Sequence, residues 1–343
     1  MHLLAFRFSA MGDVALTVPA LRGVLNSNPE LKITLVTNAA FIPMFYGIER
    51  LEVYGVRLNE YKGLRGLRKL YKELVKHEEW NAVIDLHSVM RTWILSGFFK
   101  LGKIPVFSID KGREEKAELV NQKQKTLKQL KHSTQRYLDV FQAYGIEGKL
   151  ESGELIQPMP DAVARLQNFF TSNGLSKTGK WLGLAPFSKH PQKTWPIEKI
   201  RDLLLKLTED KETQIFLLGG PEESHQLKEL AKAYKNCWNM AGVFSLEEEI
   251  ALMYELDEVI AMDSFNMHLA ALCNRKVVSI WGGTHRFAGF GPLNDNEKHI
   301  VEIPVEKLEC RPCSAFGNKP CHRGDLACLE QIQVSDVINK LQI

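Results

Sequence analysis

The sequence lacks any apolar run as long as the roughly 18 residues that a membrane-spanning helix needs. Its first residues, MHLLAFRFSAMGD, contain neither a basic leader nor a small-residue cleavage site, so no signal peptide is expected. These two absences predict a cytoplasmic protein. The sequence has only six cysteines, and in a reducing cytoplasm they are not expected to form a disulfide framework.

Several nucleotide-binding and nucleic-acid-binding signatures are also missing. There is no G-x-G-x-x-G fingerprint, which argues against a nicotinamide-dependent oxidoreductase, and no G-x-x-x-x-G-K-[ST] phosphate loop. No nucleic-acid-binding motif is recognisable, and the basic residues are not interleaved with aromatic ones. Nucleic acid is therefore not an expected partner.

The composition is that of an ordinary globular protein, with 45% hydrophobic and 25% charged residues in a chain of 343. This length suits two domains of about 150 to 200 residues each. The net charge of +3 is unevenly spread, because residues 1–149 contain 23 Lys and Arg against 15 Asp and Glu, and the remainder contains 21 against 26. The basic first half indicates an anionic partner, although a solvated surface would give the same excess.

Strand and helix patterns alternate along the chain, which predicts parallel sheets covered on both faces by helices. Strand-like apolar runs occur at 3–8, 32–37, 53–58, 82–87, 181–186, 214–220, 258–263 and 277–283. A crossover region with Pro158 and Pro160 separates the two halves. We predict an α/β fold with two Rossmann-like domains, residues 1–160 and 161–343, and ligands in a cleft at the carboxyl ends of the strands. Packing of the C-terminal helix back on the first domain is left open.

Polar side chains follow two of these runs directly. The first run ends in RFSAMGDVALTVP, which places Asp13 at the start of a helix. This carboxylate either relays a proton from a hydroxyl that becomes a nucleophile or serves only as a helix cap. In the second half, APFSKHPQKTWP places Ser188, Lys189 and Lys193 in a loop before a helix, which suits a phosphate or diphosphate.

Two further strand ends in the second half carry similar groups. FLLGGPEESHQ places a glycine pair before Glu223, an acid that either binds ribose hydroxyls or lies in a helix first turn. AMDSFNMHLAAL places Asp263, Ser264 and His268 at a strand-to-helix turn, which is either a helix cap or a ligand site. Each motif alone is weak, but in this order they describe a sugar-nucleotide pocket.

The ordered set of motifs resembles glycosyltransferase family 9, the ADP-heptose:lipopolysaccharide heptosyltransferase family. The matching segments are RFSAMGDVALTVPAL, IDKGR, KTWP, LLGGPEE, SFNMHLAAL and SIWGGTH. The resemblance implies the GT-B fold, in which two Rossmann-like domains face a central cleft. It also implies an inverting transferase that moves a heptose or related sugar from a nucleotide-diphosphate donor, ADP-heptose in the first place, to a lipopolysaccharide core or another lipid-linked surface glycan.

The resemblance implies a role for each matched donor-side residue. Ser188 and Lys193 match the groups that hold the donor diphosphate, and Glu223 matches an acid that contacts the ribose. Phe244 falls where the family places an apolar side chain against the nucleobase, and Asp263 matches an acid that contacts the donor sugar. The donor-binding residues are thus Ser188, Lys189, Lys193, Gly219, Gly220, Glu223, Phe244, Asp263, Ser264, Phe265 and His268.

On the acceptor side, Asp13 matches the proposed catalytic base of the family. The residues assigned to the acceptor are Arg7, Lys111, Arg113 and Lys116. Metal-dependent glycosyltransferases hold a cation with an Asp-x-Asp pair, and this sequence contains none, so neither a metal nor a cofactor is expected in the reaction.

Phe265 is the one clear departure from the family pattern, which usually has glycine after Asp-Ser or Asp-Thr. Phenylalanine is bulky and disfavours a positive φ, which glycine adopts readily. Its side chain either narrows the donor-sugar pocket or packs in the core behind the turn. We expect the core position, because large aromatic residues near strand ends are more often buried.

Four of the cysteines gather near the C-terminus, at Cys310, Cys313, Cys321 and Cys328. The C-x2-C pair would suit a structural zinc ion, but the second pair is more widely spaced than a zinc ribbon requires. Reduced thiols, or one incidental disulfide, are therefore the favoured interpretation.

The segment YKGLRGLRKLYKELVK contains a single acid, Glu73, and six basic residues: Lys62, Arg65, Arg68, Lys69, Lys72 and Lys76. A basic amphipathic helix of this kind indicates a membrane surface or another anionic partner, and a solvated helix face is an equal alternative. A phosphorylated, lipid-linked glycan at the cytoplasmic face of the inner membrane would fit a peripheral protein. The competing functional hypothesis is a two-lobed nucleotide-sugar or sugar-binding protein without catalysis.

Overall fold

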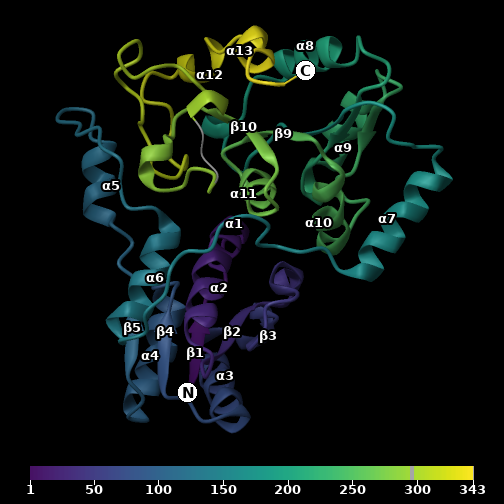
Figure 1. Ribbon diagram of the computed structural model, residues 1–343. Coiled ribbons are helices and arrows are strands. Elements are labelled where there is room, and N and C mark those ends of the chain that lie inside the picture. The colour runs from purple at the N-terminus through teal and green to yellow at the C-terminus, as the bar shows by residue number, and fades with distance from the viewer. Residues whose placement is uncertain (294–296, 343) are drawn as a thin grey trace. The chain divides into compact units, whose positions relative to one another are not determined.

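The computed structural model describes residues 1–293 and 297–342. The chain forms two compact units, drawn in Figure 1. The first contains Met1–Lys111 and Ser133–Gln157, and the second contains Gly112–His132 and Pro158–Ile343. The chain passes between units near the predicted boundary, but the second unit also takes the segment Gly112–His132, which a single boundary cannot describe.

The first unit is built on a five-stranded parallel sheet with the strand order β3-β2-β1-β4-β5. Its strands are β1 (His2–Phe6), β2 (Lys32–Asn38), β3 (Leu51–Val56), β4 (Ala82–Asp85) and β5 (Val106–Ser108). The central strand β1 is apolar and buried from Leu3 to Phe6, as expected when helices cover both faces of a parallel sheet.

The helical elements of the first unit are α1 (Met11–Ala15), α2 (Val18–Ser27), η1 (Ala39–Phe45), η2 (Leu58–Tyr61), α3 (Gly63–His77), α4 (Met90–Leu101) and α6 (Ser133–Ala143). The crossovers through α3 and α4 run in the same direction across the sheet, so right-handed connections place both helices on one face. There Tyr71 of α3 packs edge-on against Phe99 of α4, with ring centroids 4.9 Å apart.

The second unit repeats this plan with a six-stranded parallel sheet in the order β11-β10-β9-β6-β7-β8. Its strands are β6 (Trp181–Ala185), β7 (Gln214–Leu217), β8 (Cys237–Asn239), β9 (Glu258–Met262), β10 (Lys276–Trp281) and β11 (Ile300–Glu302). The α-helices are α5 (Arg113–Leu119), α7 (Pro160–Ser172), α8 (Ile197–Leu207), α9 (Ser224–Ala231), α10 (Leu246–Glu255), α11 (Phe265–Leu272), α12 (Ala327–Glu330) and α13 (Val334–Ile338), and the short helical turns are η3 (Pro191–Lys193), η4 (Pro221–Glu223), η5 (Arg286–Ala288) and η6 (Glu297–His299).

The C-terminal segment belongs to the second unit. Val337 of α13 and Leu341 beyond it are part of the apolar core that also contains Leu203 and Leu204 of α8. The final helix is thus accounted for by the core of its own unit. Within the described residues, none of the helices combines the length and the apolar character that crossing a bilayer demands.

The strand orders show where a ligand should bind. In an open parallel sheet the binding crevice lies at the carboxyl ends of the two strands where the order reverses. These strands are β1 and β4 in the first unit and β6 and β9 in the second. The predicted α/β fold with two Rossmann-like domains is confirmed, and Asp13, Ser188, Lys193 and Asp263 all follow strands that flank these two points.

Candidate active site

Asp13 lies in the first turn of α1, at the carboxyl end of β1. Its Oδ2 accepts a hydrogen bond from the Ala10 backbone N–H (3.4 Å) and forms an ion pair with Nη2 of Arg7 (2.6 Å). Both contacts use the same oxygen, and 32% of the side chain remains exposed. Asp13 therefore caps the start of α1 and still exposes part of its carboxylate. The helix-cap and proton-relay interpretations of the sequence are thus compatible.

Arg7 fixes the position of this carboxylate through the ion pair. Its side chain is buried, Nη1 donates to the Leu86 carbonyl beyond β4 (2.8 Å), and the guanidinium lies 5.6 Å from the ring centroid of Tyr137. The Tyr137 hydroxyl in turn donates to the backbone carbonyl of Asp13 (3.2 Å). These contacts assign Arg7 to positioning Asp13, and direct contact with an acceptor stays a prediction.

The end of β4 adds two residues, Asp85 and His87, that were not among the site residues predicted from the sequence. Asp85 is fully buried, and its Oδ1 accepts hydrogen bonds from the backbone N–H groups of His87 (2.9 Å) and Ser88 (2.8 Å). Burial lowers the pKa of His87 to about 3, and the charges of Arg7 and Lys111 act in the same direction, so the imidazole is neutral at pH 7.

The His87 imidazole lies beside the strand end that carries Asp13. Nε2 is 3.5 Å from the Ser9 hydroxyl, and Nδ1 is buried without a hydrogen-bond partner in the described part of the chain. The sequence signal for this pair was that the apolar run AVIDLH ends in Asp-Leu-His, with polar residues at 85 and 87. The switch point of the first unit thus presents a carboxylate, a guanidinium and a neutral imidazole.

The other residues assigned to an acceptor are divided between the two units. Lys111 ends the first segment of the first unit, whereas Arg113 and Lys116 belong to α5 in the second unit. Arg113 is exposed, but Lys116 is only 5% exposed, and its ammonium lies 4.5 Å from the ring centroid of Phe290. Acceptor binding by these residues stays a prediction, and Lys116 has little free surface for it.

In the second unit, three donor-side residues predicted from two motifs, Ser188, Lys193 and Asp263, come together. The Asp263 carboxylate is 6% exposed and forms an ion pair with Nζ of Lys193 (2.8 Å). Its Oδ2 also accepts a hydrogen bond from the Thr284 hydroxyl (2.8 Å), while the Ser188 hydroxyl donates to the Asp263 backbone carbonyl (3.2 Å). The loops after β6, β9 and β10 therefore meet at one buried charge.

Lys193 is held in place by close backbone packing. Gly317 has a φ of +73°, and a Cβ at this position would lie 2.7 Å from Cε of Lys193. The Gly283 N–H donates to the Gln192 carbonyl (2.9 Å), and a Cβ on Gly282 would lie 2.6 Å from the same oxygen. Glycine at positions 282 and 317 lets these loops approach Gln192 and Lys193 this closely.

A buried arginine fixes the loop that carries Thr284. Arg311 is fully buried, and it donates to the backbone carbonyls of Gly282 (2.7 Å) and Thr284 (3.2 Å). It also pairs with Glu302 at the end of β11 (2.9 Å). Sequence reasoning missed both Thr284 and Arg311, although SIWGGTH was part of the family resemblance.

The turn at α11 is not a conventional helix cap. Ser264 occupies the N-cap position, but its hydroxyl makes no capping hydrogen bond and is buried without a partner within the described residues. His268, one turn later, is buried at 7% exposure. A buried hydroxyl left unpaired at a helix N-terminus is costly unless a ligand occupies it, which favours the ligand-site interpretation.

Phe265 is not the core residue that we expected. It stands at the first position of α11, beyond the end of β9, and is only half-buried. Its backbone φ is not positive, so a side chain is accommodated there without strain. Phe265 is not among the buried core residues of the second unit, and a role in narrowing the donor-sugar pocket stays a prediction.

The glycine pair before α9 is packed against acids of its own turn. Oε2 of Glu223 accepts a hydrogen bond from the Gly220 N–H (2.8 Å), and a Cβ on Gly219 would lie 2.5 Å from that oxygen. Burial raises the pKa of Glu223.

Phe244 is half-buried, and its ring packs edge-on against that of Phe169, with ring centroids 5.0 Å apart. Contacts of Glu223, Phe244 and the exposed Lys189 with a donor stay predictions.

The late cysteines are all free thiols. Burial raises the pKa of Cys328 to about 12 and also raises that of Cys313. Across residues 1–293 and 297–342, no group of three or more His, Cys, Asp or Glu side chains is arranged to hold a metal ion.

The loop that carries the late cysteines is hydrogen-bonded to the segment before α6. Nζ of Lys125 donates to the Glu309 (2.6 Å) and Arg311 (2.7 Å) carbonyls.

Comparison with known proteins points to one family. The family model of glycosyltransferase family 9 (heptosyltransferase) matches residues 67–317. Lipopolysaccharide heptosyltransferase 1 of Escherichia coli K12 is 24% identical over 320 residues, which cover 90% of this chain and 95% of that protein. The resemblance stated from the sequence motifs is confirmed.

Two solved structures share the fold. A family 9 glycosyl transferase from Veillonella parvula DSM 2008 matches with a TM-score of 0.77 and 18% identity, over 99% of this chain and 95% of that chain. E. coli heptosyltransferase WaaC with ADP-2-deoxy-2-fluoro heptose matches with a TM-score of 0.62 and 22% identity, over 92% and 97%. The predicted GT-B class is confirmed.

The half-buried position of Phe265 predicts a small loss of stability on truncation. Phe265→Ala should lower the free energy of unfolding by less than about 2 kcal/mol, whereas Phe216→Ala, at a fully buried position on β7, should cost about 3–5 kcal/mol. Denaturant unfolding of both variants measures this difference. Equal losses of unfolding free energy in the two variants would show that Phe265 packs as a core residue.

Proposed function

Because the chain belongs to glycosyltransferase family 9, we propose that this glycosyltransferase moves a heptose from ADP-heptose to a lipopolysaccharide core or related lipid-linked surface glycan, with inversion at the anomeric carbon. The observation that carries the proposal is the meeting of Ser188, Lys193 and Asp263 at the switch point of the second sheet. The names of the heptosyltransferase relatives support the choice of sugar and acceptor.

On the donor side, Lys193 and Ser188 would hold the diphosphate, and the amides at the start of α11 would add further donors. Lys193 is already oriented by its pair with Asp263, so it need not be ordered when the donor arrives. Its charge would then stabilise the nucleoside diphosphate as it leaves. Asp263 would contact the sugar, with Glu223 at the ribose and Phe244 at the nucleobase.

On the acceptor side, Asp13 would accept the proton of the attacking hydroxyl. The hydroxyl oxygen forms a bond to the anomeric carbon as the bond from that carbon to the diphosphate oxygen breaks, and the proton goes to the carboxylate. Attack from the face opposite the leaving group inverts the configuration. Arg7 keeps the carboxylate in position, and the neutral His87 would offer a hydrogen bond near the same strand end.

We also propose that the reaction needs no metal ion. The developing negative charge on the leaving diphosphate has a fixed ammonium at Lys193, and the sequence has no Asp-x-Asp pair to hold a cation. Phe265 would lie beside the donor turn and restrict which sugar is accepted. We propose that a lipid-linked acceptor would be met at the cytoplasmic face of the inner membrane, with the protein acting there as a peripheral protein.

Asp13→Asn should cut turnover by about 10²–10⁴-fold, because the amide cannot accept the proton in the reaction, while donor affinity stays nearly unchanged. Steady-state kinetics and calorimetric binding of ADP measure the two effects. Asp161→Asn is the matched control, since Asp161 is also a first-turn acid, on α7. A variant at position 13 with near-normal turnover would reduce Asp13 to a cap, and a wild-type protein that binds the donor without turnover would favour the non-catalytic alternative.

Lys193→Ala should weaken ADP binding by about 1.5–3 kcal/mol, the range for a hydrogen bond to a charged group. Isothermal titration calorimetry measures the loss. Because the substitution also leaves the buried Asp263 without its cation, the melting temperature is recorded in parallel. Lys206→Ala, at an exposed position on α8, is the control. Unchanged ADP affinity in a folded Lys193→Ala protein would contradict a diphosphate contact.

A further inference from the structure

We propose that the outward faces of α3 and α4 form one surface that binds an anionic lipid bilayer. This α3–α4 surface consists of Leu64, Arg65, Arg68, Lys69, Lys72, Val75 and Lys76 of α3 and Met90, Trp93 and Leu101 of α4. The inference rests on the proposed function only in that a lipid-linked acceptor requires an enzyme at a membrane. The surface itself is argued from exposure, charge and helix geometry.

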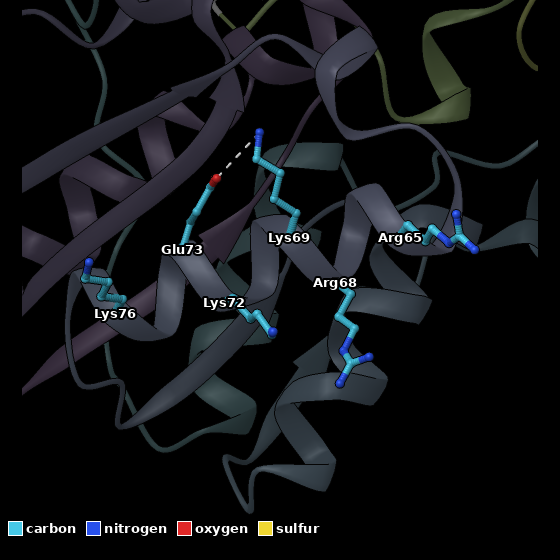
Figure 2. Close-up of a pocket in the computed structure, with 6 residues that line it drawn as sticks. All are labelled: Arg65, Arg68, Lys69, Lys72, Glu73 and Lys76. Carbon is cyan, nitrogen blue, oxygen red and sulfur yellow. Dashed lines mark ion pairs between the residues drawn. The ribbon is translucent and has the colours of Figure 1, made fainter.

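The basic residues of α3 all lie on one face. Leu67, Leu70 and Leu74 are buried against the sheet and define the inner face of the helix. At about 100° per residue, positions 64, 65, 68, 69, 72, 75 and 76 fall within an arc of about 140° on the opposite side. The five basic side chains of this arc line a shallow pocket with Glu73, as Figure 2 shows.

The single acid of this pocket does not cancel the positive charge. Glu73 accepts a hydrogen bond from the Tyr61 hydroxyl (2.7 Å) and forms an ion pair with Lys69 (3.8 Å), drawn as the dashed line in Figure 2. The Glu73 carboxylate is thus already paired with Tyr61, just before α3, and with Lys69. Arg65, Arg68 and Lys72 remain as exposed cations with no acidic partner in the described part of the chain.

The neighbouring helix presents apolar side chains where a water-exposed helix should be polar. Met90, Trp93 and Leu101 of α4 are 73%, 51% and 84% exposed, and with Gly97 they follow the spacing of one helix face. On α3, Leu64 (63% exposed) and Val75 (44% exposed) stand at the two ends of the basic row. Such a concentration of exposed large apolar residues marks an interaction surface.

The exposed faces of α3 and α4 lie on the same side of the first unit. Both helices cover the same side of the first sheet, and they pack against each other through Tyr71, Phe98 and Phe99. Their buried residues belong to one core, so their opposite faces are adjacent on the surface. Basic side chains therefore lie next to apolar ones, including the indole of Trp93.

This combination fits an anionic bilayer better than another class of partner. Amphipathic helices at a membrane place apolar and aromatic residues at the level of the acyl boundary and Lys or Arg against the headgroups. Anionic headgroups complement the cations of α3, and each basic residue near such a surface strengthens binding by about fivefold. Nucleic acid would use the charge but not the aliphatic Leu64, Leu101 and Met90.

Sedimentation with lipid vesicles tests the surface in the full chain. Wild type should bind vesicles of phosphatidylcholine with phosphatidylglycerol, should not bind phosphatidylcholine alone, and should dissociate as salt is raised, because salt screens exposed charges. The combined variant Arg65→Gln, Arg68→Gln and Lys72→Gln should bind the anionic vesicles on the order of 100-fold more weakly. Trp93→Ala with Met90→Ser should also weaken binding, yet keep the salt dependence.

The matched control is Lys211→Gln, Lys228→Gln and Lys235→Gln, which removes the same charge from exposed positions of the second unit. It should bind vesicles like wild type. Equal weakening by both triple variants, equal binding to neutral vesicles, or a dimer broken by the α3 and α4 substitutions would each overturn the proposal. The vesicle assay contains neither donor nor acceptor, and ADP affinity of the α3 variant should equal that of wild type, so failure here is distinct from failure of the proposed transferase activity.

Discussion

The buried carboxylate of Asp263 is the group on which the donor-side loops depend. A charge removed from water is costly unless it is paired and hydrogen-bonded, and here one lysine and one threonine from two other loops satisfy it. Folding of the second unit must therefore bring the ends of β6, β9 and β10 together in one arrangement. The same contacts fix Lys193, and the nearby Ser264 hydroxyl, which is buried without a partner within the described residues, stays available to the proposed anionic ligand.

The first unit solves the same problem with other residues. Arg7 is buried between Asp13 and the end of β4, so the ion pair fixes the orientation of a carboxylate that is still one-third exposed. In both units, a parallel sheet gathers the strand ends, and a cation from one strand end orients a carboxylate. In a transferase, such groups act without being reordered during the reaction, which lowers the barrier.

Much of the fold could be predicted from the sequence because the alternation of strands and helices is a local signal. Asp13, Ser188, Lys193 and Asp263 could also be named from the sequence, since each lies within about eight residues after the end of an apolar strand. The long-range contacts that orient them could not, because Lys193 pairs with Asp263 across 70 positions of sequence and Arg7 reaches Leu86 across 79. Such pairings follow from sheet order, which no local pattern encodes.

Local signals also misled in two places. The run VALTVPALRGVLNS at 14–27 has a helical pattern throughout, but the structure divides it into α1, which ends at Ala15, and α2, which begins at Val18 with Pro19 in its first turn. Phe265 was expected in the core because of its size, but its position at the start of α11 leaves it half-buried. Both errors concern element ends, where backbone geometry outweighs hydrophobicity.

The most direct test of the central claim is a measurement of ADP release from ADP-heptose by the wild-type protein, with a lipopolysaccharide core acceptor and with EDTA present. The account predicts that ADP forms in equal amount to the heptosylated acceptor, at a rate that EDTA does not change. No acceptor-dependent ADP, or a rate lost in EDTA and restored by a divalent cation, would contradict it.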